Sequence, residues 1–233
     1  MSFSIVIASR NRARQLDMAL SSIEEQYVRG SLDIVLIDDG SVDETPQVII
    51  KHGPLTRGFR INRTGGYRWN PGSVLNAAHK MTSANVVIEQ GGEVCHLTDC
   101  VGPLVKTCRP GLVSLARVYN GPEEQMKRLK ASLSLGTYHL PEDIIPDTVV
   151  TEAGHWPAAI VEGGLQLFCG LERQAPFLFL GAIHREDWNA VGGYDESLRD
   201  RNDTDLANRL TARGSKFAFL GKAVAWHRAH SKT

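Results

Sequence analysis

The 233-residue chain has no long apolar run, no excess of charge and no paired cysteine motif. No segment approaches the roughly 20 apolar residues that a membrane-spanning helix needs, and no basic leader precedes the apolar start. Lysine and arginine (26) balance aspartate and glutamate (26), so no global field attracts nucleic acid or an anionic membrane. The four cysteines lack CxxC and zinc-ligand spacing, which favours reduced core thiols. We therefore expect a cytoplasmic protein without a transmembrane segment.

Apolar runs alternate with helical patterns, and this alternation predicts an α/β domain. The continuous apolar run at residues 3–8 is typical of a strand covered on both faces, and helical spacing follows over 13–23. The run at 32–37 predicts a second strand that completes a βαβ unit. A helix at 74–81 and a strand at 85–88 extend the pattern. We expect a mostly parallel central sheet with helices on both faces, whose strand ends form a ligand-binding edge.

The second half of the chain shows less regular patterns. Residues 134–175 have no sustained period, and a stretch of that length in a compact domain is usually a functional loop region. Around it, apolar runs predict strands at 112–119, 177–184, 217–220 and 223–226, and helical spacing predicts helices at 123–133, 185–191 and 203–213.

Polar segments follow the first two predicted strands. The first strand runs into Ala8-Ser9-Arg10-Asn11-Arg12, and the second into Asp38-Asp39-Gly40-Ser41. Asp39-Gly40-Ser41 is typical of a turn whose serine caps the next helix. Because α/β proteins bind ligands at this edge of the sheet, the same segments are also candidates for ligand contact. Both interpretations stay open, since a turn and a ligand contact use different residues of one motif.

Several ordered segments of the chain resemble a family 2 glycosyltransferase with the GT-A fold, and the resemblance covers nearly the whole chain. The resemblance implies one Rossmann-like domain over 1–233, with a nucleotide-sugar-binding half at 1–97 and an acceptor-binding and catalytic half at 98–233. It also implies inverting transfer of a sugar from a nucleotide-sugar donor, expected to be UDP-linked, to an acceptor hydroxyl. The matching segments are the two above, the second extended by Asp43 and Thr45; Arg68 with Asn76-Ala77-Ala78; Gly192-Gly193-Tyr194-Asp195-Glu196; and Asn202-Asp203-Thr204-Asp205-Leu206 with the later His227.

The donor site implied by this resemblance combines carboxylates, guanidinium groups and backbone. Asp38 would accept a hydrogen bond from the uracil N–H or a ribose hydroxyl, and guanidinium groups would bond the base, the ribose or the diphosphate. For any single arginine, a solvated surface position is the alternative. The implied donor-binding residues are Ala8, Ser9, Arg10, Arg12, Asp38, Asp39, Arg68, Gly92 and Glu93.

The metal motif departs from the family pattern. Most relatives place Asp-x-Asp after the strand that corresponds to 85–88, where the carboxylates hold Mg²⁺ or Mn²⁺ against the diphosphate. Here the chain reads EQGGEVCH over 89–96, and only Glu93 can replace an aspartate. We expect Glu93 and His227 as metal ligands, with His96 as a weaker candidate. The alternatives are an exposed loop acid and structural histidines.

Asp203 is the expected general base. An inverting transferase needs a carboxylate that removes the proton of the acceptor hydroxyl. The family has this base at the second position of a Glu-Asp pair, and the pair reads Asn202-Asp203 here. Asp205 is the alternative base, and both acids would also be stable at a helix N-terminus without any catalytic role.

The acceptor and the activity itself leave alternatives. The acceptor could be a glycan, a lipid, a protein or a modified nucleic-acid base. Because Asp-x-Asp is missing, a catalytically inactive nucleotide- or carbohydrate-binding module is the competing interpretation. A nucleotidyltransferase lacks the Gly- and Lys-rich phosphate loop that we would expect near residue 10. Trp69 could stack on a base or sugar, and Trp156 and Trp188 could line the acceptor side, although tryptophans more often belong to the core.

Overall fold

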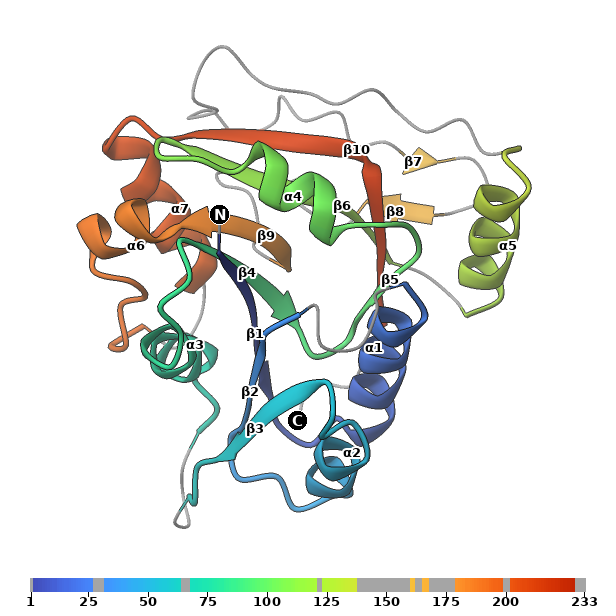
Figure 1. The fold of residues 1–233 in the computed structure, drawn as a ribbon, viewed down its shortest axis with the longest axis horizontal. Coiled ribbons are helices and arrows are strands. Elements are labelled where there is room, and N and C mark those ends of the chain that lie inside the picture. Colours follow the sequence, from blue (N-terminus) through green and yellow to red (C-terminus); the bar gives the residue numbers. More distant parts are fainter. Residues whose placement is uncertain are drawn as a thin grey trace.

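The computed structural model describes residues 2–26, 32–63, 68–120, 123–137, 160–161, 165–167, 179–198 and 202–228, which form the elements drawn in Figure 1. The helices are α1 (Ala13–Gln26), α2 (Thr45–Lys51), α3 (Pro71–Lys80), α4 (Val101–Thr107), α5 (Glu123–Ser134), α6 (Arg185–Val191) and α7 (Asn202–Ala212). The strands are β1 (Phe3–Ser9), β2 (Ile34–Asp38), β3 (Thr56–Arg60), β4 (Val86–Gly91), β5 (Val94–His96), β6 (Leu112–Asn120), β7 (Ile160–Val161), β8 (Leu165–Leu167), β9 (Leu180–His184) and β10 (Lys216–His227).

One mixed sheet runs through the molecule in the order β3-β2-β1-β4-β9-β6-β10-β5, and β8 adds to β6 and pairs with β7. The strands β3, β2, β1 and β4 are parallel, as are β6 and β10. Between these parallel groups, β9 pairs antiparallel with both β4 and β6. The prediction of a single α/β domain with a mostly parallel central sheet is confirmed.

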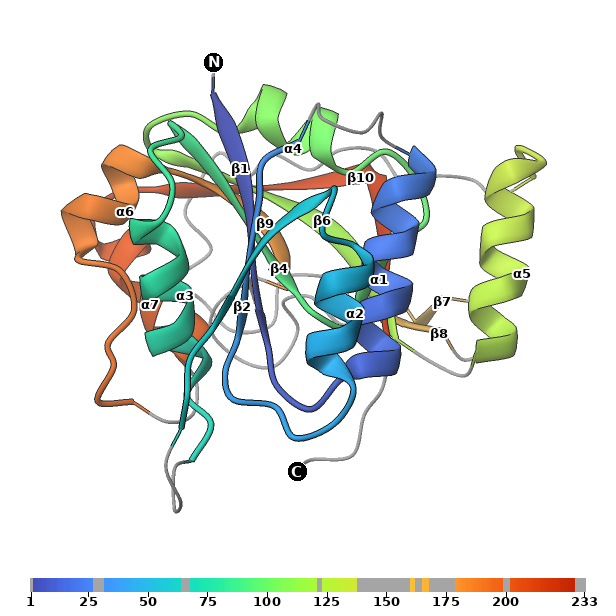
Figure 2. The same cartoon turned by 60° about the horizontal axis from the view of Figure 1, so that its bottom comes forward.

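Helices cover both faces of the parallel strands, as predicted. Alternate residues of a strand point to opposite faces, and Ile5 and Ile7 of β1 pack with the apolar side chains of α1. Val6 and Ala8 point the other way and pack with Val74 and Ala78 of α3. Figures 1 and 2 show α1 and α2 on one side of these strands and α3, α6 and α7 on the other. Because both faces of β1 and β2 are buried, these two strands read as continuous apolar runs.

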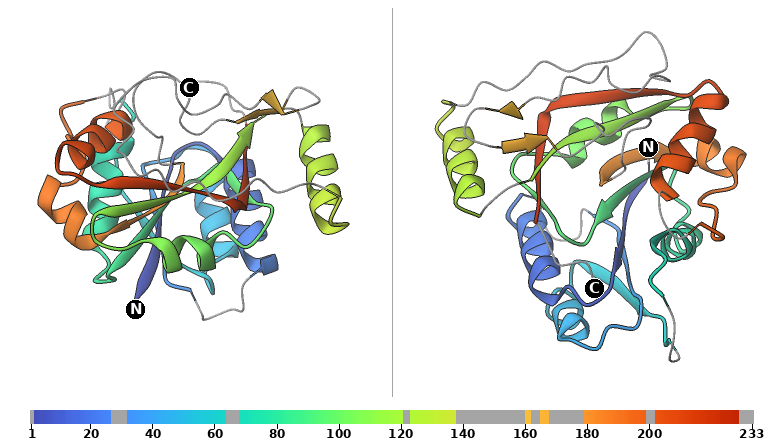
Figure 3. Two further views of the ribbon diagram at one scale, coloured as in Figure 1. Left: turned by 90° about the horizontal axis from the view of Figure 1, so that it is seen from above. Right: turned by 180° about the vertical axis from the view of Figure 1, so that it is seen from behind.

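The last strand differs from its prediction. The runs at 217–220 and 223–226 are one long strand, β10, which bends where its register against β6 shifts between Leu220 and Val224. After the bend, the strand also pairs antiparallel with β5, so that His227 lies opposite Val94. Figure 3 shows this change of direction along β10 in two views. The bend carries the end of the chain's last strand to the loop that follows β4.

Two expectations can be compared with the described part of the chain only in part. Most of residues 134–175, predicted as a functional loop region, lies outside the described residues, as do Trp156 and the start of the strand predicted at 177–184. Within the described residues, no helix combines the length and apolar character that a membrane crossing requires.

Candidate active site

A cavity of about 330 Å³ lies where β1 and β4 end, at the sheet edge predicted for ligand binding. Its apolar wall includes Trp69, Leu75 and Phe179. The other walls bring together segments from both ends of the chain. The charged and amide side chains that line it are Arg12, Glu89, Gln90, Glu93, Asn202 and Asp203.

The loops after β1 and β2 hold each other in place. Asn11 has a left-handed backbone (φ +49°), a conformation that asparagine tolerates better than most residues. Its N–H donates to Ser41 Oγ at 2.8 Å, and its Oδ1 accepts from the N–H of Val42 at 2.8 Å. The predicted cap of the next helix by Ser41 is wrong, because the residue before α2 is Glu44, whose own side chain makes no cap hydrogen bond.

Asp43 connects the same loops to the start of α1. Its two carboxylate oxygens accept from the N–H of Ala13 at 3.1 Å and from the N–H of Thr45 at 3.0 Å. Ala13 is the first residue of α1, whose first N–H groups have no partner within the helix. Asp43 therefore stabilises the helix that follows β1, although it comes 30 residues later in the chain.

Asp38, the acid predicted to bind the base or ribose, ends β2 and is 1% exposed. Its Oδ1 accepts from the N–H of Ser41 at 2.9 Å, as expected for a turn. Its Oδ2 lies 3.4 Å from a guanidinium nitrogen of Arg60. The carboxylate is thus built into the turn, and a donor contact at Asp38 remains a prediction.

Asp39 is fully buried and paired with two arginines. Its Oδ1 accepts a hydrogen bond from Arg63, and its Oδ2 lies 3.7 Å from Arg10. Arg10 also donates to the main-chain oxygen of Asp39 at 3.2 Å. Neither Asp39 nor Arg10 is among the residues that line the cavity. Both hold the loops that border it.

The loop after β4 approaches the end of β1 closely. A Cβ atom on Gly92 would lie 3.3 Å from Ser9 Oγ and 3.4 Å from the main-chain oxygen of Ala8. Ser9 is fully buried, whereas Ala8 lines the cavity. Arg68 is exposed and directly precedes Trp69 of the apolar wall. Of the predicted donor residues, Ala8, Arg12 and Glu93 therefore line the cavity, and the others do not.

Glu93 lies between a guanidinium group and an imidazole. Its Oε2 accepts from Arg12 at 3.0 Å, and its Oε1 lies 3.4 Å from Nε2 of His227. Arg12 and His227, the two partners of this carboxylate, are mostly buried. Phe179 packs edge-on against the His227 ring at 5.3 Å. The bend in β10 brings His227 to this position. Two of the three predicted metal ligands thus lie side by side.

The third predicted ligand, His96, has a different setting. Its Nε2 lies 3.0 Å from Gln90 Oε1, and Gln90 in turn donates to the main-chain oxygen of Val94 at 2.9 Å. His96 is 1% exposed, and burial lowers its pKa to about 4. Neither His96 nor His227 is among the residues that line the cavity, but His227 contacts Glu93 whereas His96 contacts Gln90. We therefore do not group His96 with Glu93 and His227.

Asp203, the predicted base, lies in the first turn of α7 and lines the cavity. Its Oδ1 accepts from the N–H of Thr204 at 2.9 Å. Burial raises the pKa of Asp203 to about 6, the main-chain hydrogen bond opposes this rise, and the negative charge of Glu89 adds to it. A carboxylate with this pKa is a stronger proton acceptor than an ordinary aspartate and still ionises at neutral pH.

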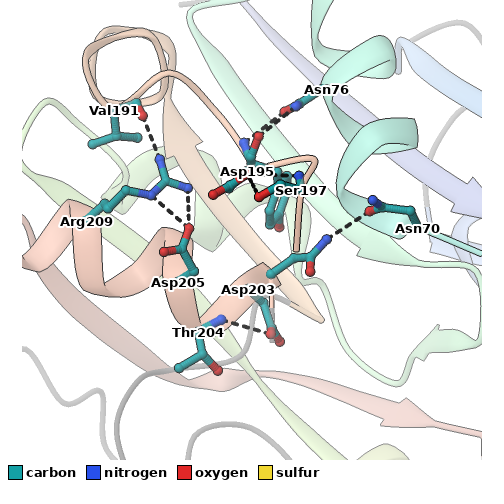
Figure 4. Close-up of polar contacts among 11 residues, drawn as sticks. Asn70, Asn76, Val191, Asp195, Ser197, Asp203, Thr204, Asp205 and Arg209 are labelled. Carbon is teal, nitrogen blue, oxygen red and sulfur yellow. Dashed lines mark hydrogen bonds and ion pairs between the residues drawn. The ribbon is translucent and has the colours of Figure 1, made fainter. Parts of the chain in front are cut away.

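Asp205, the alternative base, points elsewhere. Figure 4 shows its carboxylate directed at Arg209, one turn further along α7, whereas Asp203 points away from that arginine. Arg209 Nε donates to Asp205 at 2.8 Å, and Arg209 also donates to the main-chain oxygen of Val191. Asp205 does not line the cavity. The geometry therefore favours Asp203 over Asp205.

One family of known proteins matches more than half of the chain. Residues 4–157 match the family model described as glycosyl transferase family 2. The chain belongs to this family. No curated protein sequence matches it significantly.

Several solved structures share the fold of this chain at low sequence identity. Staphylococcus aureus TarS superimposes with a TM-score of 0.63 and 14% identity, over 98% of this chain and 37% of TarS. The mannosyltransferase PcManGT from Pyrobaculum calidifontis, solved with GDP-Man and Mn²⁺, gives 0.63 and 16%, over 99% and 58%. GalNAc-T7, solved with UDP, GalNAc and Mn²⁺, gives 0.65 and 18%, over 99% and 44%. The chain thus spans less than two thirds of these proteins, and the predicted GT-A fold is confirmed.

Three residues at or beside the cavity, Glu89, His79 and Tyr194, were not predicted as functional. Glu89 contacts His79 of α3 at 2.8 Å and accepts from the hydroxyl of Tyr194 at 2.5 Å. Trp188 stacks on His79 at 3.5 Å, so it is a core residue and does not line the cavity. The sequence signal for Glu89 was an acid that directly follows the apolar run of β4.

Proposed function

We propose that this chain is an inverting glycosyltransferase that moves a sugar from a UDP-linked donor to an acceptor hydroxyl. The observation that carries the proposal is the position of Asp203, a partly buried carboxylate in the same cavity as Arg12 and Glu93. Family membership supports the reaction class. The nucleotides named for similar structures, UDP-GlcNAc in TarS and GDP-Man in PcManGT, support a nucleotide-sugar donor.

In the proposed reaction, Asp203 accepts the proton of the acceptor hydroxyl while that oxygen attacks the anomeric carbon. The new carbon–oxygen bond forms as the bond from the anomeric carbon to the diphosphate breaks, so the nucleoside diphosphate leaves with its bonding electrons. Attack opposite the leaving group inverts the configuration. Arg12 is the cavity residue whose guanidinium can bond the diphosphate as its charge develops.

Glu93 and His227 fit a divalent ion, Mn²⁺ or Mg²⁺. Glu93 Oε1 and His227 Nε2 are 3.4 Å apart, close enough for one cation with ligand distances of about 2.1 Å. Within the described part of the chain, no three His, Cys, Asp or Glu side chains form a metal cluster. Magnesium sites often use one or two protein ligands completed by water and substrate phosphate. When bound, the ion would neutralise charge on the diphosphate.

A donor screen tests the proposal first. UDP- and GDP-linked sugars are added to the purified protein with Mn²⁺, with Mg²⁺ or with a chelator, and thermal stabilisation and donor hydrolysis are measured. We expect a UDP-sugar to raise the melting temperature and to be hydrolysed slowly without an acceptor. Stabilisation without hydrolysis or transfer would favour the inactive binding module instead.

Asp203→Asn tests the base. We expect transfer to fall about 10³-fold, within the 10²–10⁴ range of general base catalysis, while donor binding stays within a few-fold of the native protein. Asp205→Asn is the matched control, because it removes an acid from the same helix outside the cavity, and it should retain transfer. Native turnover in Asp203→Asn would contradict the assignment.

The pH dependence of turnover provides a second test. Because Asp203 must be ionised to accept a proton, and its pKa is raised to about 6, kcat/KM should fall about tenfold per pH unit below that value. An acid limb centred near pH 4 would indicate an ordinary, exposed carboxylate as the base.

A further inference from the structure

A buried network in one wall of the cavity has no role in the reaction as described so far. Its centre is Glu89 in β4, which is 1% exposed. Glu89 Oε1 lies 2.8 Å from His79 Nε2 on α3, and Glu89 Oε2 accepts from the Tyr194 hydroxyl at 2.5 Å. Both carboxylate oxygens are thus bonded by side chains from other elements. Such donors stabilise a buried negative charge that would otherwise be costly.

The partners of Glu89 are themselves fixed. His79 is 1% exposed and its ring stacks on Trp188, which fixes the direction of Nε2. The N–H of Tyr194 donates to Asn76 Oδ1 at 2.9 Å, and Asn76 Nδ2 donates back to the main-chain oxygen of Tyr194 at 2.9 Å. The Tyr194 segment is therefore held to α3 by its backbone and to β4 by its hydroxyl.

This network is electrostatically connected to Asp203. Glu89, Tyr194 and Asp203 line the same cavity. The charge of Glu89 contributes to the raised pKa of Asp203, and the charges of both acids add to the effect of burial in raising the pKa of Tyr194. The other charged groups around Asp203 are Arg12 and Glu93 on the cavity wall, His79 behind Glu89, and the ion pair of Asp205 with Arg209 on α7.

We infer that Glu89 is a positioning residue, which holds Tyr194 against the sheet and whose negative charge strengthens Asp203 as a proton acceptor. The inference rests on the proposed function, since it assigns Asp203 the role of base. It explains why an acid is buried in β4 with two donors directed at it. Glu89 acts through Asp203 and takes no proton from the substrate itself.

The direct test is the titration of Asp203 by ¹³C NMR in protein labelled at the aspartate carboxyl carbon. Asp203→Asn identifies the signal. Glu89→Gln removes the charge and nearly keeps the shape, with an amide donor in place of one acceptor oxygen, so we expect the midpoint to fall from about 6 by about 0.5 to 1 pH unit. The control Asp205→Asn removes a charge that an arginine already offsets, and its shift should be below about 0.2 unit. An unchanged midpoint in Glu89→Gln would overturn the inference.

Kinetics give a second reading of the same variant. The acid limb of kcat/KM should move to lower pH together with the NMR midpoint, a shift that a merely structural role would not produce. Loss of activity with an unshifted limb would leave Glu89 a structural residue and overturn its electrostatic role. Retained turnover in Asp203→Asn would instead contradict the proposed function, and the NMR titration would still report on Glu89.

Tyr194→Phe keeps the test decisive if Glu89→Gln does not fold. This variant removes the hydroxyl proton that offsets part of the Glu89 charge, and leaves the contact with His79. The field of Glu89 at Asp203 should therefore grow, and the midpoint should rise. A rise supports the inference, and an unchanged or lower midpoint overturns it.

Discussion

Asp39, directly after β2, and Asp203, in the first turn of α7, are both acids removed from much of the solvent, but their surroundings are opposite. Asp39 is fully buried between Arg63 and Arg10. Asp203 is hydrogen-bonded to the N–H of Thr204, contacts no cationic side chain in the described part of the chain, and lines the same cavity as Glu89, whose negative charge opposes its own. The charge of Asp39 is compensated by cationic side chains, whereas the charge of Asp203 is opposed by a nearby negative charge.

This difference separates an acid that holds the fold from an acid suited to chemistry. A paired buried charge fixes its neighbours, because separating it from its cation is costly. A desolvated charge near a like charge costs stability, and it gains reactivity because its proton affinity rises. The two aspartates can be compared by one substitution, Asp→Asn, which changes charge with little change in volume.

Asp39→Asn should have the largest effect of this series on stability. Removing the carboxylate charge leaves two partly buried arginines without their anion, and we expect a loss of about 2–4 kcal/mol, somewhat less than for fully buried pairs. Urea denaturation at pH 7.5 measures the change. Arg57, which pairs with Asp33 at the surface, offers a matched control: Asp33→Asn should cost below about 1 kcal/mol. Equal losses at the two positions would remove the distinction between buried and exposed pairs.

Asp203→Asn should have the opposite sign. The pKa of Asp203 is about 6 in the folded protein against an ordinary value of 3.8, so keeping it ionised costs at most about 3 kcal/mol at neutral pH. The native protein bears no such cost below about pH 4, acquires it between pH 4 and 6, and bears it in full above pH 6. The stabilisation in Asp203→Asn should follow this course.

Melting temperatures of both proteins between pH 4 and 8 provide the measurement. Asp203→Asn would then be inactive and more stable, a trade-off expected of a residue kept for function. A variant that is less stable than the native protein at pH 8 would show that Asp203 holds the fold, as Asp39 does.

The parts of the fold that were predictable are those with a strong local pattern. The apolar runs of β1, β2 and β4 and the helical spacing of α1 depend on burial on fixed faces, which the sequence records directly. β3 was missed because it is an edge strand with one buried residue followed by four exposed ones. β5 has only three residues, and α4 contains both Gly102 and Pro103 in seven residues. Such elements form through contacts with neighbouring helices and strands, which a local sequence pattern does not record.

The residues of the candidate site also divide into those that the sequence could predict and those that it could not. Asp203 and Glu93 could be predicted by their place in motifs, and both line the cavity. Glu89 could not, because its role depends on contacts with Tyr194, 105 residues later in the chain, and with His79 of a neighbouring helix. Nor could the pairing of Asp39 with Arg63, since a motif gives the residue type and not its partner. Contacts across elements require the folded chain.

Asp43→Asn should have the smallest effect and a pH dependence opposite to that of Asp203. Burial opposes the charge of Asp43, but hydrogen bonds from Thr45 and Ala13 outweigh burial and lower its pKa. Because a neutral amide accepts these hydrogen bonds less strongly, we expect a loss of about 0.5–1 kcal/mol, typical of a weakened helix cap.

A lowered pKa adds stability at neutral pH that disappears as the pH falls below about 4. The difference in the free energy of unfolding between Asp43→Asn and the native protein should therefore shrink in acid. The difference for Asp203→Asn has the opposite sign and should also vanish there. Thermal unfolding of the two variants over one pH series measures both. Curves of the same sign would mean that capping and catalytic acids cannot be told apart by their surroundings.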